Sequence, residues 1–80
     1  MNTLASVEQG QTVEVKNIVG DDKALVRRLL DLGITPKTKV TKVRTAPFGD
    51  PIELSVRGYS LTMRLADALL VEVIEWHVLL

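Results

Sequence analysis

Histidine and cysteine, the side chains that most often bind zinc, are almost absent from this sequence. It contains one histidine, His77, and no cysteine, so neither a histidine-based nor a thiolate metal site can be assembled. We interpret His77 as a side chain of the C-terminal tail. A site made of carboxylates alone would have to bring Asp50, Glu53 and Asp67 together in space. The sequence does not establish that they meet, so metal binding stays open, and no cofactor is expected.

Carboxylates that could serve in acid–base catalysis occur as the adjacent pair Asp21 and Asp22, directly after Gly20. At the start of a helical pattern such residues usually cap the free backbone N–H groups of the first turn. The sequence contains no glycine-rich phosphate loop, no G-x-S-x-G nucleophile turn and no H-E-x-x-H zinc motif. We therefore predict a binding protein rather than an enzyme.

A basic run without an intervening acidic residue consists of Lys37, Lys39, Lys42 and Arg44. Such a run is either a solvated strand face or a contact surface for an acidic partner. The ten basic and ten acidic residues of the chain cancel, and the aromatic interleaving typical of single-strand binders is absent. If the run makes contacts, a protein is therefore a better partner than a nucleic acid.

The composition predicts one small domain covering residues 1–80. Apolar residues make up 46% of the chain but only three residues are aromatic, so aliphatic side chains are expected to build the core. The first ten residues lack the basic and apolar segments of a secretory signal, and no apolar stretch approaches the length of a membrane span. These features predict a cytoplasmic protein.

One long helix is predicted over residues 22–32. Leu25, Leu29 and Leu32 recur at i, i+4 and i+7, which places them on one helix face. Gly33 is expected to end the helix, because glycine adopts the left-handed conformation of the C′ position at low cost. Shorter helical turns are predicted near residues 3–7 and 66–68.

Alternation of apolar and polar residues predicts about five short strands. The clearest covers residues 52–56, and Gly58-Tyr59 is expected to form the hairpin turn that follows it. Val40 and Val43 are three residues apart, which predicts a bend or bulge in the second strand. A small sheet removes most of its exposed edges by curling. We therefore predict a mainly β fold with one helix (α+β), a small SH3-like β-barrel with the helix between strands 1 and 2 and across one open end.

The stretch APFGDP connects the second and third predicted strands. Pro47 and Pro51 restrict the backbone, and Gly49 can supply the chain reversal. The Asp50 carboxylate can accept hydrogen bonds from nearby backbone N–H groups and lock the turn. Phe48 has two open interpretations: it folds under and fills the end of the barrel, or it stays exposed as an anchor for a partner.

The apolar C-terminal tail, residues 75–80, contains the single tryptophan, Trp76. The tail either closes the barrel or packs on the helix, or it forms an exposed arm. An exposed arm would be a plausible contact in a homodimer. The oligomeric state therefore remains open.

Three segments carry a resemblance to the ferrous iron transport protein A (FeoA) family: RLLDLGITP, APFGDPIELSVRG and LTMRLADALLVEV. The family pattern has a helix ending in RLxxLGhxPG (h, apolar), an APhGDP connection, a strand, a turn with glycine and an LR-x-x-x-A segment. Matching positions are occupied by Arg28 to Gly33, Ala46 to Pro51, Gly58, Arg64 and Ala68. Lys37 stands where the family commonly has glycine, which predicts a type I turn or a left-handed lysine.

This resemblance covers residues 4–74 and implies an SH3-like barrel. It also implies a small cytoplasmic accessory protein of bacterial ferrous iron uptake. The implied partner is the ferrous iron transporter protein B, a membrane protein with a cytoplasmic G-protein domain, so contact with the membrane would be indirect. The chain would support the assembly or the activity of that transporter. The alternative is an SH3-like protein-interaction module of an iron-responsive regulatory system, because iron-dependent repressors carry a related domain.

We predict a partner-binding surface that combines Lys42, Arg44, Phe48 and Asp50. The residues expected to hold the loop and its surroundings in shape are Pro47, Gly49, Pro51, Gly33 and Arg64. Arg64 is expected to do so through hydrogen bonds to the carbonyl oxygens of the short helical turn.

Overall fold

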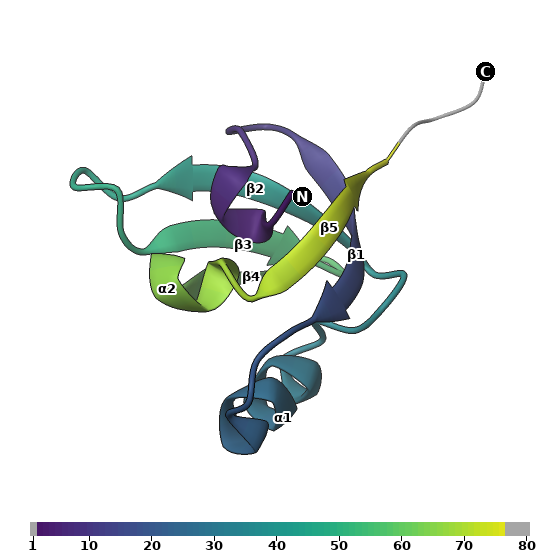
Figure 1. Cartoon of the computed structure of the whole chain (residues 1–80). Helices are drawn as coiled ribbons and strands as arrows, with labels where there is room; N and C mark the ends of the chain where they lie inside the picture. Colours follow the sequence, from purple (N-terminus) through teal and green to yellow (C-terminus); the bar gives the residue numbers. More distant parts are fainter. Residues whose placement is uncertain (1, 77–80) are drawn as a thin grey trace.

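The structure is a computed structural model of the chain, and it describes residues 2–76. It consists of an antiparallel sheet with one longer helix after the first strand (Figure 1). In chain order the elements are the 3-10 turn η1 (Leu4–Ser6), β1 (Thr12–Ile18), α1 (Lys23–Asp31), β2 (Lys39–Thr45), β3 (Ile52–Val56), β4 (Tyr59–Met63), α2 (Leu65–Ala68) and β5 (Val71–Glu75). The predicted mainly β fold, with the long helix between the first two strands, is confirmed.

The strands of the described chain form one sheet in the order β4-β3-β2-β1-β5. β4 and β5 do not pair, so the sheet is not closed as a barrel, and the predicted SH3-like β-barrel is correct in its strands and helix but not in its closure. The reason lies in the segment that joins these two strands. It contains α2, which packs against η1, and η1 in turn packs against β5. Helical turns therefore occupy the space in which the two edge strands would have to meet.

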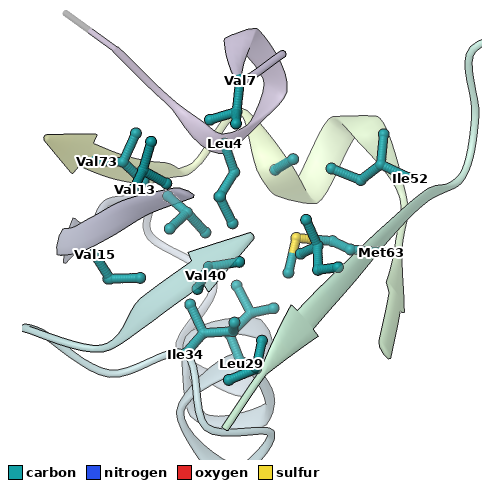
Figure 2. Packing of buried hydrophobic residues seen from close by; sticks show 14 residues of the cluster. Leu4, Val7, Val13, Val15, Leu29, Ile34, Val40, Ile52, Met63 and Val73 are labelled. Atoms are coloured by element: carbon teal, nitrogen blue, oxygen red, sulfur yellow. The ribbon is translucent and has the colours of Figure 1, made fainter. Parts of the chain in front are cut away.

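Aliphatic side chains from the sheet, from η1 and from α1 fill the core (Figure 2). The alternation in β3 shows how the pattern works, because Ile52, Leu54 and Val56 are fully buried and the two polar residues between them are not. Successive strand residues point to opposite faces, so a period of two puts every apolar side chain inside. No aromatic side chain of residues 2–76 is among the buried core residues.

The helix α1 begins and ends within one residue of the predicted positions. The Asp22 carboxylate accepts a hydrogen bond from a backbone N–H of the first turn at 3.1 Å, and Gly33 has a φ of +97°. Leu29 is the only fully buried residue of α1. The Tyr59 hydroxyl donates a hydrogen bond to the Leu32 carbonyl and fastens the end of the helix. α1 lies at one end of the sheet, beyond β1, and Leu29 joins it to the core (Figure 1).

The turn between β3 and β4 differs from the prediction. Its two central residues are Arg57 and Gly58, with φ values of +51° and +86°, and not Gly58 and Tyr59. Positive φ at both positions is typical of the type I′ turn, whose twist matches that of paired strands. The Arg57 guanidinium donates to the hydroxyl oxygens of Thr35 and Thr38 at 3.4 and 3.2 Å, which holds this residue in place.

The described part of the chain ends at Trp76. Its ring centroid lies 4.3 Å from Lys39 Nζ, a cation–π contact that places the ring against β2. His77, and with it most of the predicted apolar tail, lies outside the described residues. A homodimer formed through residues 75–80 therefore stays a prediction.

Candidate partner-binding surface

The loop between β2 and β3 is a tight turn with Phe48 near its tip. The Gly49 N–H donates to the Ala46 carbonyl at 2.8 Å and closes a turn with Pro47 in its second position. Proline favours this position because its ring fixes φ. Gly49, the fourth residue of this turn, has a φ of +88°, a conformation that favours glycine. The Ala46 N–H also donates to the Pro51 carbonyl at 3.0 Å, so the two ends of the loop are joined.

Asp50 fastens this loop to α2. Its Oδ1 accepts a hydrogen bond from the Leu65 N–H at 2.8 Å, across 15 positions of sequence. The prediction that the carboxylate would accept from the amides of its own turn is therefore replaced by a contact with a distant helix. The peptide bond between Asp50 and Pro51 is cis. Asp50 supports the loop from its base, whereas Phe48 points away from the molecule.

The Phe48 side chain is 99% exposed. The interpretation in which this ring fills the core is therefore wrong, and the structure has the exposed ring of the other interpretation. The next most exposed large apolar residue of the described chain, Leu69, is 57% exposed. Single exposed apolar side chains are common on protein surfaces. Phe48 differs from them because its backbone is fixed by two prolines, a turn hydrogen bond and the Asp50 contact.

The predicted bulge in β2 is present, and it separates two residues of the predicted surface. The register between β2 and β3 shifts so that Lys42 lies opposite the buried Leu54 and Arg44 lies opposite Glu53. Residues directly opposite each other project from the same face of a sheet. Lys42 therefore lies on the core side, where its Nζ donates to the Val7 carbonyl at 3.0 Å. The structure does not bring the Lys42 side chain to the outer face that carries Arg44.

Arg44 lies beside the loop on the outer face of the sheet. Its Nε donates to Glu53 Oε1 at 2.7 Å, and its side chain is 72% exposed. An open pocket next to the loop is lined by Arg44, Thr45, Ala46, Pro47, Pro51, Glu53 and Thr62. We call Arg44, Pro47, Phe48, Pro51 and Glu53 the loop surface.

Arg64 holds the short helix α2 in a way that differs from the prediction. Its Nε lies 3.5 Å from Asp67 Oδ2, and Arg28 Nη2 lies 3.4 Å from the same oxygen. The Asp67 side chain is 8% exposed, so two exposed arginines meet at one buried carboxylate. The partner of Arg64 is therefore a carboxylate and not a carbonyl oxygen. The contact of Arg28 with Asp67 has no signal in the sequence, because 39 positions separate the two residues and no local pattern connects them.

The three carboxylates considered for a metal site have different partners in the structure. Asp50 accepts from the start of α2, Glu53 binds Arg44, and Asp67 binds two arginines. Within residues 2–76, no three side chains of histidine, aspartate or glutamate are grouped in a way that would hold a metal ion.

The helix ending at Gly33 and the APFGDP loop are the two features with the most specific sequence pattern. The family model of the FeoA domain matches residues 2–73, a range that contains both. The chain belongs to the FeoA family. The resemblance found in the sequence is thereby confirmed, and it associates the chain with ferrous iron transport.

Solved FeoA structures share the fold of this chain. The FeoA protein from Chlorobium tepidum is 36% identical, covers 95% of this chain and 71% of its own, and superimposes with a TM-score of 0.87. The FeoA-like protein from Clostridium acetobutylicum is 40% identical over 94% of this chain and 88% of its own, with a TM-score of 0.78. A zinc complex of FeoA from Stenotrophomonas maltophilia, described as a prokaryotic SH3 domain protein, is 25% identical over 92% and 91%, with a TM-score of 0.81. The fold is therefore the SH3-like fold of FeoA proteins.

One position departs from the FeoA pattern with a visible structural result. Lys37, where the family commonly has glycine, has a φ of +73°, so the left-handed lysine is the option that the chain adopts. A separate finding concerns membranes. None of the helices within residues 2–76 is long and apolar enough to cross one.

Proposed function

We propose that this FeoA protein is an accessory protein of bacterial ferrous iron uptake that binds the cytoplasmic G-protein domain of the ferrous iron transporter protein B. The chain would then work in the cytoplasm and support the assembly or the activity of the transporter. Membership in the FeoA family supports the link to ferrous iron transport. The contact with the transporter and its location on the loop surface are our proposal.

The observation that carries this proposal is the exposure of Phe48 on a loop that is already held in place. Binding usually costs conformational free energy because loops and side chains become ordered. Here the turn hydrogen bond and the contact between Asp50 and Leu65 order the backbone before a partner arrives. An aromatic side chain presented in this way is typical of the hot spots that carry most of the binding energy. Arg44 adds guanidinium donors next to the loop, where it lines an open pocket together with Pro47 and Pro51.

Calorimetric titration tests the proposal directly. The purified chain is titrated with the soluble cytoplasmic domain of the transporter from the same organism, with and without guanine nucleotide. We expect saturable binding in at least one nucleotide state. Phe48→Ala is expected to weaken it by about tenfold or more, as for a hot-spot residue.

A matched control is Ile74→Ala. Ile74 is 46% exposed on β5, an edge strand of the sheet that does not carry the loop. We expect this variant to bind within about twofold of the unaltered chain, since scattered surface residues contribute little. Absence of binding in every nucleotide state would contradict the proposed partner. Equal affinities of the Phe48 and Ile74 variants would contradict the proposed surface.

A further inference from the structure

The strand β4 has an edge that is not used within the described chain. Its five residues pair with β3 in an uninterrupted register, from Tyr59 opposite Val56 to Met63 opposite Ile52. Within residues 2–76, no strand pairs with its other side. The second edge strand, β5, differs in this respect. There the Val73 N–H donates to the Asn2 carbonyl at 3.0 Å and the N-terminal segment covers part of the edge.

The backbone groups that face this free edge can be assigned from the hairpin geometry. In a two-residue hairpin the residues flanking the turn, here Val56 and Tyr59, exchange hydrogen bonds with each other. The pattern then alternates along the strand. Ser60 and Thr62 therefore direct their N–H and C=O groups away from β3, and both residues are exposed. Four backbone hydrogen-bonding groups are presented side by side.

β4 also lacks the features that normally prevent an edge from pairing. Edge strands are commonly protected by charged residues, prolines or bulges. The β4 sequence YSLTM contains no charged residue and no proline, and its ladder has no irregularity. The ladders between β1 and β5 and between β2 and β3 both contain a register shift. The longest uninterrupted ladder of the sheet, with Tyr59–Met63 paired to Ile52–Val56, is thus the one that ends at a free edge.

An open pocket lies between β4 and α1, next to the free edge. Its lining consists of Arg28, Leu29, Leu32, Leu61, Thr62, Met63, Arg64 and Asp67. Its lining thus combines apolar side chains from the helix and from the strand with two arginines and an aspartate. A strand added to β4 would place alternate side chains toward this pocket.

The charges around the edge favour an acidic occupant. The Arg28 and Arg64 side chains are 59% and 70% exposed, and they share a single carboxylate, that of Asp67. One positive charge therefore remains without a counter-charge in this group, and N–H donors of both guanidinium groups stay free for a ligand carboxylate. A second copy of this chain fits less well. Antiparallel self-pairing centred on Leu61 would bring Arg64 of one copy close to Arg57 of the other.

We infer that the β4 edge accepts an extended acidic and apolar segment of the transporter's cytoplasmic domain as an additional antiparallel or parallel strand. The Ser60 and Thr62 backbones provide the hydrogen bonds, and Arg28 and Arg64 bind carboxylates of the added segment. Main-chain pairing supplies affinity in this mode of recognition, and the side-chain contacts supply specificity. The inference rests on the proposed function, and it adds a second contact site whose contribution can be separated from that of Phe48.

Hydrogen exchange of the unaltered chain is the first measurement. Ser60 and Thr62 are exposed residues whose amides point away from β3. We expect the exchange of these amides to slow by about tenfold or more when the transporter domain binds, because each becomes hydrogen-bonded. The Leu61 amide, already bonded to β3, is expected to change much less. Unchanged exchange at Ser60 and Thr62 in a saturated complex would overturn the inference.

A proline variant tests the same edge by affinity. Thr62→Pro removes an N–H that points away from β3, so the existing ladder keeps its bonds. We expect the affinity for the transporter domain to fall by about tenfold or more, with Arg64→Gln giving a smaller loss. Lys23→Pro is the matched control. It places proline at the first position of α1, where proline is tolerated, and should bind within about twofold of the unaltered chain.

The outcomes separate this inference from the proposed function. Loss of binding in Phe48→Ala with full binding in a folded Thr62→Pro would overturn strand addition and leave the proposed function standing. No binding by the unaltered chain would overturn both. A dimer of the chain alone that Thr62→Pro dissociates, measured by light scattering, would show a second copy on this edge and would also overturn the inference. If Thr62→Pro does not fold, the exchange measurement decides.

Discussion

The Asp50 carboxylate accepts a hydrogen bond from the Leu65 N–H at 2.8 Å. Leu65 is the first residue of α2, and the first N–H groups of a helix have no partner within the helix. The residue at the N-cap position, Arg64, has no capping hydrogen bond from its own side chain. Asp50 therefore caps α2 from a distant loop, and the same bond fixes the base of the turn that carries Phe48.

Replacing Asp50 tests this link. Asp50→Ala removes the acceptor, and we expect the free energy of unfolding to fall by about 1 kcal/mol, as for loss of a helix cap. Asp50→Asn keeps one amide oxygen as acceptor, so its free energy of unfolding should fall by less than that of Asp50→Ala. Urea denaturation followed by circular dichroism measures both. Equal stability of Asp50→Ala and the unaltered chain would show that the loop and α2 are not coupled.

Phe48→Ala is expected to leave stability almost unchanged. The ring is 99% exposed, so its removal creates no cavity, and the change in unfolding free energy should stay within about 0.5 kcal/mol. Leu54→Ala is the contrasting variant, because Leu54 is fully buried and its truncation should cost about 3 kcal/mol or more. Denaturation midpoints of the two variants give the comparison. A loss of about 3 kcal/mol in Phe48→Ala would restore the interpretation that the ring fills the core.

Lys37→Gly is expected to stabilise the protein. Lys37 has a φ of +73°, a conformation that costs a side chain with a Cβ about 1 kcal/mol or more relative to glycine. Glycine also keeps the backbone N–H, which donates to the Val15 carbonyl at 2.7 Å. Because glycine loses more entropy on folding, the net gain should be up to about 1 kcal/mol. Lys37→Ala, which retains the Cβ, should show no such gain in a thermal melt.

The elements of this fold could be predicted because they depend on local rules. The alternation of apolar and polar residues predicts β3, and the i, i+4 spacing of leucines predicts α1. The three-residue spacing between Val40 and Val43 predicts the bulge of β2. Closure of the sheet could not be predicted in the same way. It depends on where α2 and η1 pack, which is a relation between segments far apart in the chain. The hairpin turn was misplaced by one residue because Arg57, held by two threonines, takes a positive φ that sequence alone assigns to glycine.

The candidate site was predictable only in part for a related reason. The pattern of two prolines and a glycine indicated a rigid loop with Phe48 near its tip, but it could not decide between a buried and an exposed ring. Lys42 lies on the core side because it is two residues beyond the buried Val40, and the bulge after Lys42 turns Arg44 to the outer face. The free edge of β4 has no positive signal in the sequence. The absence of charge from YSLTM becomes meaningful only once the strand is known to lie at an edge.

Gly33→Ala is expected to destabilise the protein by two separate effects. The φ of +97° is unfavourable for alanine, at about 1–2 kcal/mol. An added Cβ would also lie 2.8 Å from the Tyr59 hydroxyl oxygen. Gly49→Ala separates the effects, because Gly49 has a φ of +88° but no atom within 4 Å of an added Cβ. In thermal melts we expect Gly33→Ala to lower the melting temperature more than Gly49→Ala does. Adding Tyr59→Phe to Gly33→Ala removes the hydroxyl and should recover part of the lost melting temperature. Equal losses at the two glycines would contradict the close approach.

The group of Arg28, Arg64 and Asp67 predicts an unequal effect of removing its members. Asp67→Ala removes a carboxylate whose side chain is 8% exposed, and the two arginines, being exposed, regain water. We expect this variant to lose about 1 kcal/mol of stability, the usual range for such ion pairs. The double variant Arg28→Ala with Arg64→Ala leaves the carboxylate without a cation, and it should lose about 2 kcal/mol or more.

Combining all three substitutions distinguishes this explanation from simple loss of contacts. If an uncompensated carboxylate is the main cost in the double variant, then adding Asp67→Ala should restore part of the lost stability. If each contact contributes independently, the triple variant should be the least stable of the set. Urea denaturation of the four proteins at low and high salt gives the comparison. High salt should reduce the differences in unfolding free energy between the four proteins only slightly. The shared carboxylate is buried, so salt screens it less than it screens an exposed ion pair.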